Sequence, residues 1–154
     1  MQNSRFALAV HVLVLLAIEK KDEPTTSEYL AFSASTNPVV IRRILGGLRR
    51  AGLVTAQPGA GGGSNLARNP EEITLLEVYR AVGGTELFSI GDREPNPECI
   101  CGRNLQPILI GVFFQAEKAA EASLARITIA ELAREVEECE QGETFHVKFD
   151  QLTS

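Results

Sequence analysis

The pattern that most constrains the fold occupies residues 38–52. Asn37 and Pro38 have the character of a helix N-cap and first helical residue, and Gly52 that of a C-cap. The apolar residues between them follow helical spacing and predict a buried stripe: Ile41, Ile44, Leu45 and Leu48. At roughly 100° per residue, four basic residues share an arc of about 120° on the other side: Arg42, Arg43, Arg49 and Arg50. We therefore expect a helix with one apolar and one basic face.

Charge is divided unevenly between the two halves of the chain. The net charge of the 154 residues is −5, which by itself argues against a nucleic-acid partner. Residues 1–70, however, carry eight bases and four acids, whereas residues 71–154 carry seven bases and sixteen acids. No acid occurs from residue 38 to residue 68, although a solvated, solubilising surface usually mixes both signs. The pattern favours nucleic-acid binding by the first half over a solvated basic face.

Two helices are expected before the basic helix, and a hairpin after it. Residues 4–19 are apolar nearly all round, which predicts a buried helix capped by Ser4, with His11 partly buried and bonded to a neighbouring element. Thr25 and Glu28 have the spacing of a capping box, which predicts a second helix ending near residues 33–35. Residues 53–57 and 64–68 form short strands around a glycine-rich turn without the ending of a P-loop.

This order of elements is typical of a winged helix-turn-helix unit, whose third helix enters the major groove. We predict a mainly α protein: three helices plus a two-stranded wing, followed by a long dimerisation helix. The predicted divisions are a DNA-binding domain over residues 1–84, a loop over residues 85–103, dimerisation helices over residues 104–140 and a tail over residues 141–154.

The second half begins with a helix over residues 75–82, capped by Thr74, which is expected to pack back on the winged unit. Residues 85–90 are compatible with an extended segment, and residues 91–103 with a loop.

A long amphipathic helix over residues 104–125, about 33 Å in length, predicts a two-fold homodimer; the alternative is that it packs along its own domain. The expected dimer contacts are Leu105, Ile108, Leu109, Val112, Phe113, Ala116 and Ala120. Thr128 opens a last helix over residues 131–139, and weak alternation at residues 145–149 suggests a strand in the tail.

Several segments together resemble the Rrf2 family of bacterial transcriptional regulators over residues 2–135. They are SRFAL (4–8), PVVIRRIL (38–45), LRRAGLV (48–54), GGG (61–63) with LARNP (66–70), and ITLLEV (73–78). The resemblance implies a winged-helix repressor or activator that works as a homodimer through its long helix. Several members bind an iron–sulfur cluster through three cysteines in the loop before that helix.

The cysteines of this chain depart from that ligand set, because the loop contains only Cys99 and Cys101, and Cys139 follows much later. Two thiolates fall short of the four ligands usual for a cluster, which a histidine, a carboxylate or a partner subunit would have to complete. We expect no required cofactor and weigh an iron–sulfur cluster below the alternatives. Thiol-based sensing at Cys99 and Cys101, no ligand role, and metal binding all stay open. Without a recognisable export signal or membrane-spanning stretch, a cytoplasmic protein without a membrane partner is expected.

The predicted function is sequence-specific binding of double-stranded DNA by a homodimer, as a repressor of a palindromic operator. Base edges are expected to face Ser35, Thr36, Asn37, Val39, Arg42 and Arg43. Phosphates are expected at Arg5, Arg49 and Arg50, and at the backbone of Gly61 and Gly62, because the wing lacks the basic residue usual in the family. The alternative is a winged-helix adaptor that binds an acidic protein instead of DNA. No nucleophile–base set, paired carboxylates or cofactor motif indicates an enzyme.

Overall fold

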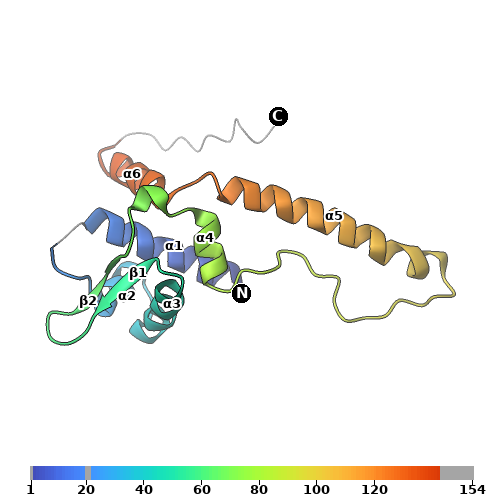
Figure 1. The fold of residues 1–154 in the computed structure, drawn as a ribbon, viewed down its shortest axis with the longest axis horizontal. Coiled ribbons are helices and arrows are strands. Elements are labelled where there is room, and N and C mark those ends of the chain that lie inside the picture. The colour runs from blue at the N-terminus through green and yellow to red at the C-terminus, as the bar shows by residue number, and fades with distance from the viewer. Residues whose placement is uncertain (1, 20–21, 143–154) are drawn as a thin grey trace.

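The computed structural model describes residues 2–19 and 22–142 (Figure 1). In chain order the elements are α1 (Gln2–Glu19), α2 (Ser27–Ser33), α3 (Pro38–Arg50), β1 (Val54–Gln57), β2 (Gly63–Leu66), the 3₁₀ helix η1 (Pro70–Glu72), α4 (Leu75–Ala81), α5 (Ile100–Leu124) and α6 (Ile129–Glu140). The first three helices and the antiparallel β1–β2 wing form a winged helix-turn-helix, which confirms the predicted fold class. Figure 1 shows α5 extending away from this unit.

The hydrophobic core forms where α1 packs against α3, α4 and α6. Because α1 is apolar nearly all round, residues such as Val12 and Leu13 are fully buried. The predicted stripe of α3 is buried on the same core: Ile41, Ile44, Leu45 and Leu48. The chain returns to this core after α5, since Ile129 of α6 is fully buried and its N–H donates to the Ile73 carbonyl at 2.9 Å.

Two predicted helix starts in the winged unit are wrong. α1 already begins at Gln2, so Ser4 lies inside the helix; nothing in the first residues breaks a helix. α2 is capped by Thr26, whose side chain accepts the Tyr29 N–H at 3.2 Å, instead of by Thr25. Thr25 is occupied elsewhere, because its backbone exchanges hydrogen bonds of 3.0 and 2.8 Å with Ser64 of the wing.

The predicted caps of α3 and α4 are confirmed. The Asn37 side chain accepts the Val39 N–H at 2.8 Å, and Gly52 adopts a φ of +73°, the left-handed conformation that glycine favours after a helix. Thr74 forms a capping box with Glu77. The interpretation of His11 is half right: its Nε2 lies 2.9 Å from the Ser33 Oγ of α2, but its side chain is exposed, because that contact is at the surface.

The later helices also begin earlier than predicted. α5 starts at Ile100, four residues ahead of expectation, because the preceding loop folds against its first turn, where Arg103 donates to the carbonyls of Pro97 and Glu98, both at 3.0 Å. α6 starts at Ile129, directly after its cap Thr128. Residues 85–90 form no strand, since their Leu87 and Phe88 N–H groups bond to a side chain of α5. The strand suggested at residues 145–149 lies outside the described residues.

Of the helices in the described part of the chain, none has the length and apolarity that crossing a membrane requires.

Candidate nucleic-acid interface

The exposed face of α3 carries the predicted basic arc. Because the apolar stripe turns into the core, the side chains of Arg42, Arg43, Arg49 and Arg50 all lie in solvent. Gly47 shows how closely the buried side is packed, since an added Cβ would lie 3.0 Å from the Ala81 carbonyl oxygen of α4. The apolar and basic faces therefore point where the sequence predicts.

A groove of about 560 Å³ runs between this face and the wing. Its walls are the start of α2, one side of α3 and the glycine-rich turn with the adjoining strand ends. Of the predicted DNA-binding residues, it brings together Arg42, Arg49, Gly61 and Gly62. The others do not line it: Arg5, Ser35, Thr36, Asn37, Val39, Arg43 and Arg50. Arg5 lies on α1, where the next residue, Phe6, packs edge-on against Tyr79 of α4 at a centroid distance of 5.4 Å.

The residues that join α2 to α3 hold the start of α3 in place. Ser35 adopts a φ of +48°, an uncommon conformation for a residue other than glycine. The Thr36 N–H donates to the Ala31 carbonyl at 2.9 Å. The side-chain amide oxygen Oδ1 of Asn37 accepts the Val39 N–H as the helix cap. The exposed Val39 follows in the first turn. These hydrogen bonds fix the backbone path into α3, and Asn37 keeps its side-chain amide N–H groups for a ligand.

The wing is short and tightly turned. Val54 pairs with Leu66 and Gln57 with Gly63. Between the strands, an added Cβ at Gly62 would overlap the Gln57 carbonyl oxygen, which explains a glycine there. The Gly62 N–H already donates to the Gly59 carbonyl at 3.0 Å, so within the predicted pair the Gly61 N–H is the one left for a phosphate.

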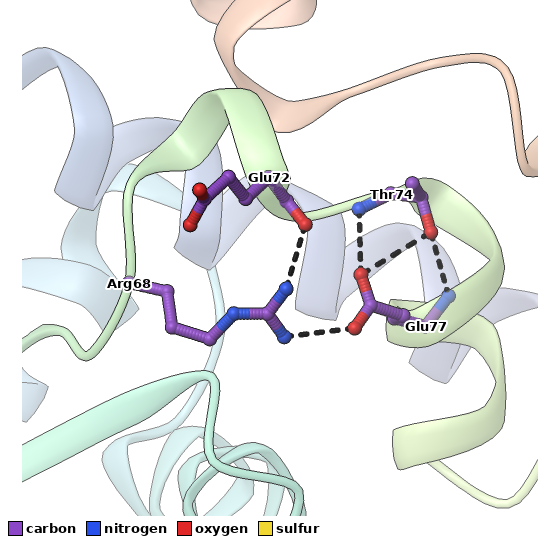
Figure 2. Close-up of polar contacts among 4 residues, drawn as sticks. All are labelled: Arg68, Glu72, Thr74 and Glu77. Carbon is purple, nitrogen blue, oxygen red and sulfur yellow. Dashed lines mark hydrogen bonds and ion pairs between the residues drawn. The ribbon is translucent and has the colours of Figure 1, made fainter.

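Arg68 follows the wing and is held by acidic partners, as Figure 2 shows. It donates to the Glu77 carboxylate and to the Glu72 carbonyl, each at 2.8 Å. Burial raises the pKa of Glu77, but hydrogen bonds from Arg68 and Thr74 and the charge of Arg68 outweigh it, so the pKa lies below its usual value. The same contacts raise the pKa of Arg68. Arg68 therefore joins the wing to the capping box of α4 and adds little positive charge to the surface.

Glu28 is a residue of this surface that the sequence interpretation missed. Its carboxylate lies 2.6 Å from Nη2 of Arg42, on the wall of the groove. The interpretation assigned Glu28 to a capping box with Thr25, whereas the actual cap, Thr26, places it in the first turn of α2 without that role. Thr26 as an alternative cap was the signal that could have placed it correctly.

Comparison with known proteins agrees with this architecture. The family model described as "Rrf2: Iron-dependent Transcriptional regulator" matches residues 2–135. The chain belongs to the Rrf2 family. YwnA of Bacillus subtilis (strain 168), assigned as an HTH-type transcriptional regulator, is 44% identical over 126 residues, which are 81% of this chain and 91% of YwnA.

Solved structures show the same fold in other proteins. A crystal structure described as that of a DNA-binding protein is 36% identical, has a TM-score of 0.66, and matches 83% of this chain and 97% of its own. The IscR structure from T. potens has a TM-score of 0.65 over 92% of this chain and 90% of its own. At 22% identity, IscR supports the fold alone. Since Rrf2 proteins are DNA-binding transcriptional regulators, the family places this chain among such regulators.

The family description raises the question of an iron site, which the cysteines answer by their positions. Cys99 is the N-cap of α5 and Cys101 lies in its first turn, whereas Cys139 lies on α6. The 25 residues of α5, about 37 Å, separate the pair from α6. Among the described residues, no three His, Cys, Asp or Glu side chains come together as a metal site. Within the part of the chain that the structure describes, the donors of one chain therefore do not come together as the ligand set of an iron–sulfur cluster.

The two loop cysteines are nevertheless accessible thiols. Both are exposed, and neither is part of a disulfide. Within the described residues Cys99 makes no capping hydrogen bond through its side chain, yet the nearby N–H groups of Gly102 and Cys101 lower the pKa of its thiol. The effect follows from the partial positive charge at a helix start, which favours the thiolate.

In the described part of the chain, the long helix of this Rrf2 protein contacts its own chain through its second half. The Glu117 carboxylate accepts the N–H groups of Leu87 and Phe88 at 2.9 and 3.3 Å, and Phe88 stacks on Phe113 at 5.3 Å. One turn further on, Glu121 lies 3.5 Å from Arg80 of α4. None of the residues of α5 is buried. Six of the predicted dimer contacts are partly or fully exposed side chains of α5: Leu105, Ile108, Leu109, Val112, Ala116 and Ala120. Phe113 differs, because Phe88 already covers one side of its ring.

Proposed function

We propose that this Rrf2 protein is a homodimeric repressor that binds a palindromic DNA operator. The observation that carries the proposal is the exposed face of α3, where four arginines lie opposite a buried apolar stripe and beside the wing. A helix of this kind fits the major groove, and guanidinium groups bind both phosphates and guanine edges.

The arginines divide between two roles by their place on α3. Arg42 and Arg43, in the first half of the helix, are assigned to base edges together with the residues at its start: Ser35, Thr36, Asn37 and Val39. Arg49 and Arg50, in its last turn, are assigned to phosphates, with Gly61 of the wing supplying a backbone N–H. Arg5 lies apart from the groove and is assigned to phosphate beyond it.

The proposed dimer uses the exposed stripe of α5. A 25-residue helix without a buried residue leaves apolar surface that a second copy can cover. Two-fold symmetry then places two α3 helices for half-sites about one DNA turn apart, near 34 Å, on a palindrome. A dimer bound across a promoter excludes other proteins from it, which is the basis for proposing repression.

The proposed regulation acts through Cys99 and Cys101 at the start of α5. Both thiols are exposed, and the helix start favours the Cys99 thiolate. Oxidation or alkylation of these thiols changes the first turn of α5, the helix that forms the proposed dimer interface. This change shifts the population between dimer geometries, and the DNA affinity changes with it.

The test measures binding to the protein's own promoter region by fluorescence anisotropy at several salt concentrations. Arg42→Ala/Arg43→Ala is expected to reduce affinity at least about 25-fold, since each guanidinium–guanine pair contributes about 1–3 kcal/mol. Arg126→Ala/Arg134→Ala is the control, because it removes the same charge from exposed positions outside the groove. Unchanged binding by the first variant, or equal losses in both, would refute DNA recognition by α3 and favour the adaptor that docks on an acidic protein.

A further inference from the structure

The basic face of α3 carries one acid, and the fold brings it there from another helix. The sequence has no acidic residue between 38 and 68, yet Glu28 of α2 lies 2.6 Å from Nη2 of Arg42. Within the described part of the chain, Arg43, Arg49 and Arg50 make no ion pair with an acid. Arg42 therefore differs from the other arginines of this face.

The local structure explains why Glu28 is available to Arg42. Because Thr26 caps α2, the capping-box position falls on Tyr29 and Glu28 has no backbone N–H to accept. Thr25, which has the right spacing to Glu28, is bonded to Ser64 of the wing instead. The Glu28 side chain is thus left to reach across to α3, and the pair lines the groove beside Arg49.

Stability is a weak reason for this ion pair. Both side chains are mostly exposed, and exposed pairs contribute little to folding. A carboxylate on a DNA-binding face also repels phosphates and lowers affinity for any sequence. The ion pair does restrict the freedom of Arg42, because Glu28 holds one of the guanidinium N–H groups. The planar guanidinium keeps its other donors for a base.

We propose that Glu28 is a specificity-determining positioning residue, which holds Arg42 so that its remaining N–H groups read one guanine in each half-site. This inference rests on the proposed function. An arginine oriented before binding loses less entropy on reaching the correct base. At another base Arg42 gains no bidentate contact, while the repulsion between Glu28 and DNA remains. Glu28 therefore raises the ratio of specific to non-specific affinity and lowers the non-specific part.

The experiment selects binding sites from a library of random-sequence DNA duplexes, using the full chain. Wild type, Glu28→Gln and Glu23→Gln are compared, followed by titrations on the selected duplex and on its single-base variants. Glu28→Gln keeps the size of the side chain and removes its charge. Glu23→Gln removes the same charge from an exposed loop position just before α2 and outside the groove.

Glu28→Gln is expected to bind random DNA more tightly and to lose preference at one position of each half-site by at least about fivefold, the lower end for an arginine–guanine pair. Glu23→Gln is expected to keep that preference. In an Arg42→Ala background, Glu28→Gln should leave base preference unchanged, because Glu28 acts through Arg42.

Three results would overturn the inference. Glu28→Gln could retain the wild-type preference, Glu23→Gln could lose it equally, or Glu28→Gln could still change it without Arg42. If wild type itself selects no sequence, the proposed DNA function fails and the role of Glu28 fails with it. If wild type selects a sequence and Glu28→Gln shows the same base preference, only the role of Glu28 is refuted and the DNA function stands.

Discussion

The exposed stripe of α5 allows a quantitative prediction about assembly. Ile108 lies in this stripe and is 60% exposed in the single chain. Full burial of an aliphatic side chain contributes about 1.5–3 kcal/mol. Covering the exposed part of Ile108 is therefore worth about 1–2 kcal/mol per copy and, because a two-fold interface uses each residue twice, about 2–4 kcal/mol per dimer.

Ile108→Asp removes this contribution and adds two carboxylates to the apolar interface. Each carboxylate costs about 1–3 kcal/mol or more when it loses water without gaining a partner. The dimer is expected to weaken by at least about 4 kcal/mol, which is roughly a 1,000-fold rise in its dissociation constant. Sedimentation equilibrium at micromolar concentration should then show a monomer where wild type is a dimer.

Ile110→Asp is the matched control. Ile110 is 52% exposed, so the change in hydrophobicity is similar, but at about 100° per residue it lies about 160° from Ile108 around the helix. It should remain a dimer. An Ile108→Asp variant that circular dichroism shows to be folded and that still dimerises would contradict this interface. So would a monomer formed by Ile110→Asp alone, because the interface would then lie on the opposite face.

The lowered pKa of Glu77 makes its contribution to stability depend on pH: it is fully present above the pKa of the unfolded chain, about 4.3, and is lost as pH falls through the lower pKa of the folded state. Glu77→Gln should reduce the free energy of unfolding by about 1 kcal/mol at pH 7 in urea titrations, with the gap to wild type closing below pH 4; a gap independent of pH would contradict the role of the charge. At the start of α5, the pH midpoint for iodoacetamide alkylation of Cys99, measured in Cys101→Ser/Cys139→Ser, should lie below that of the same chain in urea. Adding Gly102→Ala should move the midpoint back up, since its Cβ would overlap the Asn96 carbonyl oxygen and displace the loop; equal midpoints in folded and unfolded chains would exclude an effect of the helix start.

The parts of the fold that the sequence predicts well are those specified by neighbouring residues. α3 is the clearest case, since its cap Asn37, its stripe and its terminal Gly52 all lie within one short segment. The Thr74 capping box is likewise local. Such signals act over three or four residues, so a single sequence contains all that is needed to interpret them.

The error at the start of α2 occurs where a distant segment decides between local alternatives. Thr25 and Thr26 are both good helix caps, and the choice falls on Thr26 because Thr25 pairs with Ser64, far along the chain. The early start of α5 has a nearer cause, because Arg103 donates to the carbonyls of Pro97 and Glu98 in the loop just before the helix. Thr25 and Thr26 have the same local propensity to cap a helix, so sequence spacing alone does not show which of them is the cap.

The same limitation applies to the charge pattern from which DNA binding is inferred. Counting along the chain treats Arg42 and Arg68 as equivalent bases of the first half, but the fold gives them different acidic partners. Glu77, from the acidic half, binds Arg68 into the junction between the wing and α4. Glu28, which the count places in the basic half, reaches the groove. A residue's contribution to recognition therefore depends on which charges the fold places around it. The segregation of charge in the sequence predicts which half binds DNA, but it does not predict which arginine is held by an acid.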